Sequence, residues 1–340
     1  MPIVNILTTA YNSRDYIRDT ISSVLNQTFQ DWEWIIVDDG STDDTAGIIK
    51  KTGDGRIRYF RQERTGLQRL SYSYNKALSY SRGKIIAMLD HDDLWTRNKL
   101  RLQVEAFDEE DVVLSYGECS VIDHKKRQIS YMGLPKDPSI ANNNPAGAAL
   151  HELLYNRHNF LATSTVMVRR DTLQDIGGFQ HARGLFQDFP TWTRLSIEGN
   201  FIAVPHCLGY WRRYPLSSSL NTDPESLFDA GINFLRDFRS LNKDKLLHLG
   251  LHFDQDLLGK HWEDLRREFT TYLPYNRAML MLRLGRFDDA RVEFKKFFSQ
   301  HSTIKNTLIY YSVIASGLIK IDLANPLSTL KSKAMNILKT

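Results

Sequence analysis

The stretch KIIAMLDHDDLW, residues 84–95, is an apolar strand that runs into a cluster of acidic residues. Asp90, Asp92 and Asp93 stand so close together that their carboxylates repel one another unless a positive charge lies among them. Carboxylates grouped in this way suit a hard divalent cation such as Mg²⁺ or Mn²⁺, which prefers oxygen ligands and leaves positions for phosphate oxygens. The alternative is a solvated turn whose aspartates cap a helix.

Outward from this stretch, the first ninety residues alternate between short apolar strands and amphipathic helices. Strands are predicted at IVNILT (3–8), WEWIIV (32–37) and RIRYF (56–60), with helices within residues 14–27, 45–51 and 70–83. This alternation predicts an α/β fold with a mixed, mainly parallel sheet and helices on both faces. Ligands bind such sheets at the carboxyl ends of the strands. Three polar segments follow strands and should converge at one edge: TTAYN (8–12), DDGS (38–41) and DHDD (90–93).

The pattern loosens after residue 111 and becomes helical beyond about 220. Strands are predicted at VVLSYGECSVI (112–122) and STVMVRR (164–170), and a Pro-, Asn- and Gly-rich loop at 133–149. Residues 275–300 predict two helices joined by a tight turn at Gly285-Arg286, with a partial tetratricopeptide repeat as the alternative. We therefore expect a domain at 1–220 and a helical region at 221–340.

Composition excludes several classes of protein. The 340 residues are 42% apolar and 25% charged, as in ordinary globular chains, and a net charge of +4 is too weak to indicate nucleic-acid binding. Cys119 and Cys207 lack metal-site spacing and should pack as small apolar residues. There is no signal-peptide pattern, and the apolar stretch at 307–319 is short for a membrane span. We expect a cytoplasmic protein, either soluble or peripheral on the inner face of the membrane.

The segment IIVDDGSTDD (35–44) reads as a strand, a turn and the start of a helix. Asp38 or Asp39, at the strand tip, could accept a hydrogen bond from a base N–H or a ribose hydroxyl. The structural alternative gives Asp43 or Asp44 the role of helix cap and Gly40 only the turn.

The order TAYN, VDDGS, LDHDD, GGF, QD and WRRYPLSSS resembles family 2 of the inverting glycosyltransferases, which have the GT-A fold, over residues 1 to about 220. The resemblance implies a nucleotide-sugar donor, usually a UDP-sugar, bound across the strand ends. It implies that the base and ribose are met by the residues Thr9, Ala10, Tyr11, Asn12, Asp38 and Asp39. It also implies that Asp90 and Asp92 form a DxD motif, with Asp92 as the direct ligand of Mn²⁺ or Mg²⁺ and His91 as the middle residue.

The resemblance further implies that Asp188, in FQDFPTW, is the base that removes a proton from the acceptor hydroxyl. Gln187 stands where the family has a glutamate, and a helix N-cap before Pro190 is the structural alternative for Asp188. Arg212 and Arg213 could clamp the diphosphate, although Tyr214 replaces a common histidine.

Further expectations concern the acceptor and the helical region. Arg69 is a candidate contact to the base or phosphate, and the loop at 131–160 is expected to face a glycan or lipid-linked acceptor. Its candidate residues are Tyr131, Asn142, Asn143, Asn144, His151 and His158. The C-terminal helices either contact a membrane surface or pack on their neighbours.

Competing functions remain open at this point. A sugar-phosphate nucleotidyltransferase would need a glycine-rich loop with Lys or Arg after the first strand, and TTAYNSRD (8–15) lacks it. A non-catalytic nucleotide- or sugar-binding module would keep the donor site without a working base. By its family resemblance, the enzyme would act in bacterial cell-surface polysaccharide or glycan assembly.

Overall fold

The structure is a computed structural model that describes residues 1–155, 160–181, 188–214, 224–252, 254–302, 306–307, 309–311 and 313–314. The chain divides into two compact units. The first comprises Met1–Arg213 and Ser226–Gly259, and the second Tyr214–Glu225 and Lys260–Thr340. The predicted boundary near 220 stays a prediction, since residues 226–259 group with the first unit.

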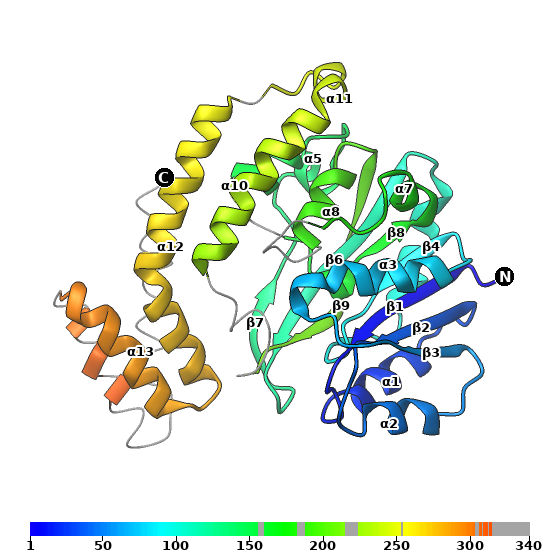
Figure 1. The fold of residues 1–340 in the computed structure, drawn as a ribbon, viewed down its shortest axis with the longest axis horizontal. Helices are drawn as coiled ribbons and strands as arrows, with labels where there is room; N and C mark the ends of the chain where they lie inside the picture. Colours follow the sequence, from blue (N-terminus) through cyan, green and yellow to red (C-terminus); the bar gives the residue numbers. More distant parts are fainter. Residues whose placement is uncertain are drawn as a thin grey trace. The chain divides into compact units, whose positions relative to one another are not determined.

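A mixed sheet forms the centre of the first unit (Figure 1). Among the described residues its order is β3-β2-β1-β4-β8-β6-β9-β5, and β7 pairs with β6. The strands are β1 (Val4–Ala10), β2 (Trp32–Asp38), β3 (Ile57–Arg61), β4 (Ile85–Met88), β5 (Leu94–Trp95), β6 (Val112–Ile122), β7 (Gln128–Met132), β8 (Met167–Arg169) and β9 (Asn200–Arg212). This confirms the predicted mixed α/β fold, with parallel pairing among β1–β4 and also between β6 and β9.

Parallel pairing determines where the polar segments lie. β1 pairs in parallel with both β2 and β4, so the carboxyl ends of these strands meet at one edge of the sheet. In register, Ala10 lies opposite Asp38, and Leu7 lies opposite Met88. The predicted convergence of the segments at 8–12, 38–41 and 90–93 is therefore confirmed.

Helices cover both faces of the sheet, as predicted. Neighbouring residues of β1 point to opposite sides: Ile6 packs with Ile21 and Ile48 in one core cluster, and Leu7 packs with Tyr74 and Trp192 in the other. The helices of this unit are α1 (Ile17–Leu25), α2 (Thr45–Lys51), α3 (Leu70–Tyr80), α4 (Lys99–Val104), α5 (Pro138–Ala141), α6 (Leu150–Tyr155), α7 (Arg170–Asp175), α8 (Asp188–Leu195), α10 (Pro224–Leu241) and α11 (Lys243–His248).

The predicted loop at 133–149 is not without structure. It contains the short helix α5, and Asn143 is fully buried beyond it. The Asn143 amide donates to the carbonyl oxygens of Ser196 and Gly199 at 2.7 and 2.8 Å, and its side-chain oxygen accepts from the N–H groups of Gly147 and Ala149. One buried side chain thus fixes the path of this segment against the end of α8.

The second unit contains most of α12 (Gln255–Arg283) and α13 (Phe287–Gln300). Its core joins Ala278 and Leu282 to Phe287, Phe294 and other apolar residues. The predicted helix, turn and helix at 275–300 is confirmed, although the first helix begins earlier, at Gln255. Gly285 makes the turn with a φ of 73°, which costs glycine little. Within the described residues, no helix is both long and apolar enough to span a bilayer.

A lysine in α4 gives a test of the core. Lys99 is fully buried, its Nζ has no hydrogen-bond partner among the described residues, and it lies 4.4 Å from the centre of the Trp95 ring. Burial lowers the pKa of Lys99 well below its ordinary value. The unfolded chain therefore binds more protons between the folded pKa and about 10.4, so this group makes stability rise with pH over that range.

We expect Lys99→Met to stabilise the protein by about 1 kcal/mol or more at pH 7, because no ammonium then has to be desolvated or neutralised. The gain should shrink toward pH 10. Urea unfolding at pH 7 and pH 9.5 measures both effects, and the exposed Lys125→Met serves as the control that changes neither. A variant less stable than wild type at pH 7 would show that the Trp95 contact holds a charged lysine.

Candidate nucleotide-binding and catalytic site

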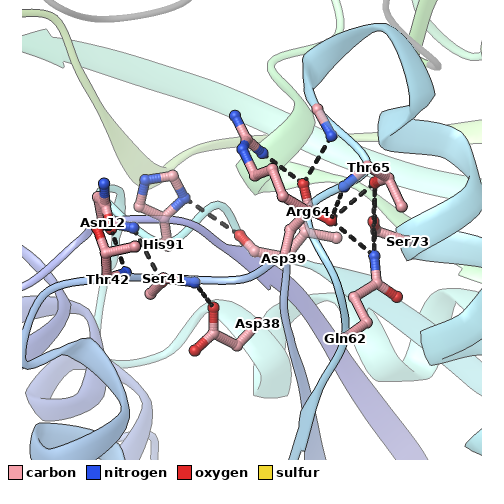
Figure 2. A network of polar contacts seen from close by, with 12 residues as sticks. Asn12, Asp38, Asp39, Ser41, Thr42, Gln62, Arg64, Thr65, Ser73 and His91 are labelled. Atoms are coloured by element: carbon pink, nitrogen blue, oxygen red, sulfur yellow. Dashed lines mark hydrogen bonds and ion pairs between the residues drawn. The ribbon is translucent and has the colours of Figure 1, made fainter.

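The end of β1 supplies the first wall of the site. Thr9 and Ala10 are buried, whereas the Tyr11 ring is partly exposed at the edge of the sheet. Asn12 has a φ of 46°, in the left-handed region that asparagine tolerates better than most residues. It accepts a hydrogen bond from Thr42 N–H at 2.8 Å and donates its own N–H to Ser41 Oγ at 3.0 Å (Figure 2). Asn12 therefore ties the first polar segment to the second.

Asp38 has a structural role. It is fully buried, and its two carboxylate oxygens accept from the N–H of Ser41 at 2.8 Å and from the hydroxyl of Tyr59. Gly40 follows with a φ of 79°, and a Cβ there would lie 3.0 Å from the backbone nitrogen of Arg64. These contacts close the turn after β2, so in this structure Asp38 fixes the turn and Asp39 is the aspartate presented at the strand end.

Asp39 holds the loop that follows β3, as Figure 2 shows. Its Oδ1 accepts from Gln62 at 2.8 Å and from both the N–H and the hydroxyl of Thr65 at 2.8 and 2.7 Å. Its Oδ2 accepts from Gly66 N–H at 3.0 Å and pairs with Arg64. Partial burial works to raise the pKa of Asp39, but the hydrogen bonds from Gln62, Thr65 and Gly66 outweigh it and lower the pKa.

Arg64, which no sequence pattern singled out, also lies at this edge of the sheet. Its guanidinium carbon lies 3.4 Å from the centre of the Tyr11 ring while the group pairs with Asp39. Three strand ends thus meet here, since Tyr11 follows β1, Asp39 follows β2 and Arg64 follows β3. The one available signal was an arginine in the loop after a parallel strand, a position that also suits a solvated side chain.

The acid cluster after β4 contains carboxylates with different surroundings. Asp90 Oδ1 accepts from the hydroxyl of Tyr74 on α3 at 2.5 Å. Burial, followed by the nearby charge of Asp92, raises the pKa of Asp90 to about 6. Asp188 also contributes to this rise, so its carboxylate lies within electrostatic range of Asp90. The structure therefore brings the predicted base and the DxD pair to one place.

Asp93 is a structural member of the cluster. It is 2% exposed, and its carboxylate accepts from the hydroxyl of Ser164 and from the backbone N–H of Arg212, the latter at 2.8 Å. Burial and the charges of Asp92 and Asp90 raise its pKa well above the ordinary value. Its hydrogen bonds join the end of β4 to the end of β9.

The His91 ring contacts the end of β1. Its Nδ1 lies 3.1 Å from the carbonyl oxygen of Thr9, and its own carbonyl accepts from Thr20 at 3.0 Å. In this structure His91 therefore links the first and third polar segments.

Asp92 is the carboxylate best placed for a cation. It is partly exposed, and none of the described residues donates a hydrogen bond to its side chain, whereas its backbone carbonyl accepts from Arg212 Nε at 2.8 Å. The described residues contain no group of three or more potential metal ligands. Mg²⁺ and Mn²⁺ are commonly held by one or two carboxylates together with substrate phosphates, so Asp90 and Asp92 fit such a cation.

Asp188 is the first residue of α8, and its roles as base or as helix N-cap both stay predictions. Pro190 and Trp192 of this helix are buried in the core, which fixes the helix against the sheet. Gln187 lies outside the described residues.

The predicted arginines lie in different environments. Arg212 is 1% exposed, and its guanidinium contacts Asp19 at 3.1 Å in addition to the Asp92 carbonyl. Arg213 is partly exposed, with its guanidinium 5.0 Å from the centre of the Trp211 ring. Arg69 is exposed at the end of the short 3-10 helix Leu67–Arg69. In this structure Arg212 holds the acid cluster in place, and phosphate contacts by these three arginines stay predictions.

The acceptor candidates are spread over the segment from β7 to α6. Tyr131 is 46% exposed and donates to Glu118 at 2.6 Å, while Asn142 accepts from Ala203 N–H at 3.0 Å. Asn143 is buried as described above, and Asn144 and His151 are exposed. His158 lies outside the described residues.

Comparisons with known proteins agree with this architecture. The family model described as glycosyl transferase family 2 matches residues 5–177, half of the chain. The Escherichia coli protein named UDP-Glc:alpha-D-GlcNAc-diphosphoundecaprenol beta-1,3-glucosyltransferase WfaP is 40% identical over 199 residues, covering 58% of this chain and 72% of the relative.

Solved structures share the fold at low sequence identity. S. aureus TarS 1–349 in complex with UDP-GlcNAc has a TM-score of 0.56 and 15% identity, covering 97% of this chain and 92% of TarS. The mannosyltransferase PcManGT from Pyrobaculum calidifontis, in complex with GDP-Man and Mn²⁺, has a TM-score of 0.52 and 16% identity, covering 98% and 84%. With its sheet, its strand-end aspartates and these matches, the chain belongs to glycosyl transferase family 2.

Proposed function

We propose that this enzyme transfers a sugar, with inversion, from a UDP-sugar to a hydroxyl of a lipid-linked glycan. The observation that carries the proposal is the gathering of Asp39 and the Asp90–Asp92 pair at one edge of the sheet, and the charge of Asp188 acts on Asp90. Family membership supports the transferase and speaks against the nucleotidyltransferase alternative. An activity assay distinguishes this enzyme from a non-catalytic nucleotide- or sugar-binding module.

The base and the diphosphate of the donor would bind at two different parts of this edge. Tyr11 offers a partly exposed aromatic face on which a base can stack, and Asp39 offers a carboxylate held in its charged form by a lowered pKa. Asp90 and Asp92 would hold a divalent cation beside the diphosphate. When bound, that cation stabilises the negative charge on the departing diphosphate. The complexes of TarS with UDP-GlcNAc and of PcManGT with GDP-Man and Mn²⁺ support this arrangement by fold.

Transfer with inversion needs one displacement. The Asp188 carboxylate accepts the proton of the acceptor hydroxyl while the hydroxyl oxygen forms a bond to the anomeric carbon and the bond from that carbon to the diphosphate oxygen breaks. A base near neutral pH must be unprotonated, and α8 presents Asp188 from its first turn, where the helix dipole favours a negative charge.

The acceptor class is inferred from the relatives. WfaP is named for a GlcNAc-diphosphoundecaprenol acceptor, and the same kind of lipid-diphosphate-linked sugar is proposed here, in the assembly of a bacterial surface polysaccharide. Such an acceptor is membrane-bound, so we place the enzyme in the cytoplasm at the inner face of the membrane, with peripheral contact through the C-terminal helices.

Thermal unfolding with nucleotides tests the donor site. We expect UDP with Mn²⁺ to raise the midpoint by a few degrees, because a ligand at one hundred times its Kd adds about 2.7 kcal/mol to stability. GDP, CDP and dTDP with and without Mn²⁺ complete the panel, and Asp92→Asn should abolish the metal-dependent part of the shift. A metal-dependent UDP shift that survives in Asp92→Asn would place the cation elsewhere, and no shift with any nucleotide would contradict the donor site.

A further inference from the structure

A guanidinium occupies the surface on which the base is proposed to bind. Arg64 lies 3.4 Å above the centre of the Tyr11 ring and pairs with the Asp39 carboxylate (Figure 2 shows the Asp39 side of this arrangement). The Arg64 side chain is 42% exposed, whereas that of Asp39 is 8% exposed. The arginine therefore covers both groups from the solvent side.

The guanidinium and a pyrimidine base make the same two kinds of contact. Both are flat groups that stack on an aromatic face, and both can present an N–H donor to a carboxylate oxygen. Uracil carries such an N–H on its ring, in the plane of the stack. A uridine nucleotide that used Tyr11 and Asp39 would consequently compete with Arg64 for each of them.

The hydrogen bonds of Asp39 show which donor has to leave. Its carboxylate accepts five hydrogen bonds, although a carboxylate offers about four lone-pair positions. Two of the donors are backbone N–H groups of Thr65 and Gly66, and Gln62 is also held by Ser73 at 2.8 Å. Arg64 is the exposed donor on a flexible side chain, so its replacement by an incoming N–H costs less free energy than replacement of the other donors.

We propose that Arg64 closes the base site of the unliganded enzyme and that a uracil-type base exchanges with it on Tyr11 and Asp39. This inference rests on the proposed function, because it takes Tyr11 and Asp39 as the base-binding residues. The exchange makes occupancy selective: a ligand replaces both contacts only if it brings a flat ring together with an N–H donor. The loop itself stays in place, since Thr65 and Gly66 remain bonded to Asp39.

Removal of the side chain should favour the nucleotide. In Arg64→Ala, the base no longer displaces an exposed ion pair and a stacked cation, and we expect UDP to bind about tenfold more tightly. Inorganic diphosphate, which has no base, should bind with unchanged affinity. Arg64→Lys keeps the charge but cannot stack as a plane, and it should bind UDP with intermediate affinity.

Isothermal titration of UDP and of inorganic diphosphate, both with Mn²⁺, tests the exchange on the full chain. The matched control is Arg58→Ala, which removes an arginine of β3, the strand that precedes the Arg64 loop; Arg58 pairs with Glu33 at 3.2 Å and touches neither Tyr11 nor Asp39. This control should bind both ligands as wild type does. A melting temperature for each variant confirms that it is folded.

The outcomes separate the two proposals. If wild type binds UDP and Arg64→Ala binds it equally or more weakly, the proposed exchange is wrong, whereas the donor site is supported. An equal change for UDP and diphosphate also overturns it, because the effect is then not at the base. If neither wild type nor Arg64→Ala binds UDP, the proposed donor site is wrong, and the exchange that rests on it is wrong too.

Discussion

Replacement of Asp188 by asparagine is expected to lower kcat for sugar transfer between about a hundredfold and ten-thousandfold, the range typical of a lost general base. Asparagine has nearly the size of aspartate and caps a helix about as well, so the first turn of α8 should remain intact. The amide, however, cannot take the proton of the acceptor hydroxyl. The substitution therefore removes the predicted base role and preserves the predicted N-cap role.

The measurement is transfer of labelled sugar from a UDP-sugar to a synthetic lipid-diphosphate-linked acceptor, together with UDP binding. UDP affinity with Mn²⁺ should stay within about twofold of wild type, since Asp188 does not contact the nucleotide in the proposed arrangement. Asp171→Asn, in the first turn of α7 and 74% exposed, is the matched control and should keep full activity. Transfer by Asp188→Asn at more than a tenth of the wild-type rate would place the base elsewhere.

Replacement of Arg212 by methionine is expected to destabilise the protein by about 1–3 kcal/mol, because buried acceptors lose their hydrogen-bond donor. The guanidinium is 1% exposed and contacts the Asp19 carboxylate at 3.1 Å and the Asp92 carbonyl at 2.8 Å. Its carbon also lies 4.8 Å from the centre of the Tyr16 ring. Methionine fills the space but removes the donor to the Asp92 carbonyl and one of the two cations of Asp19, which also pairs with Lys126 at 2.6 Å.

Urea unfolding gives the size of this effect, and Arg213→Met provides the comparison. Arg213 is partly exposed, so its removal should cost less than about 1 kcal/mol. UDP titration of both variants then tests the predicted diphosphate clamp: weaker binding in Arg213→Met at unchanged stability would assign the phosphate contact to Arg213. Stability of Arg212→Met within about 1 kcal/mol of wild type would mean that the buried guanidinium does not hold the acid cluster.

The sheet edge and its polar segments could be predicted because both depend on local pattern. Apolar strands alternate with helices along the first ninety residues, parallel pairing follows from that order, and parallel strands end at the same edge. Asp92 and Tyr11 were accessible to sequence reasoning for this reason, whereas Asp188 was selected by the resemblance to the family. The positions of Asp92 and Tyr11 relative to the strands and helices follow from the pattern of the residues next to them in sequence.

Contacts between distant segments could not be predicted in the same way. Tyr74 bonds Asp90 from α3, Ser164 bonds Asp93 from the turn before β8, and Asp19 of α1 receives Arg212 of β9. Each of these partners lies at least sixteen residues from the group that it contacts. Single serine, tyrosine and aspartate residues at such separations carry no pattern that marks them.

By itself, the sequence determined the α/β class, the edge at which the site forms and the identity of its acidic motifs, because periodicity and strand order act over short stretches of chain. Only the tertiary structure decided what each motif residue does. Asp38 and Asp39 are neighbours, yet the first closes its own turn with Ser41 and Tyr59 while the second binds the loop after β3. Arg212 is buried and Arg213 is partly exposed, because successive side chains of an extended segment point to opposite faces, and only packing decides which face is inside.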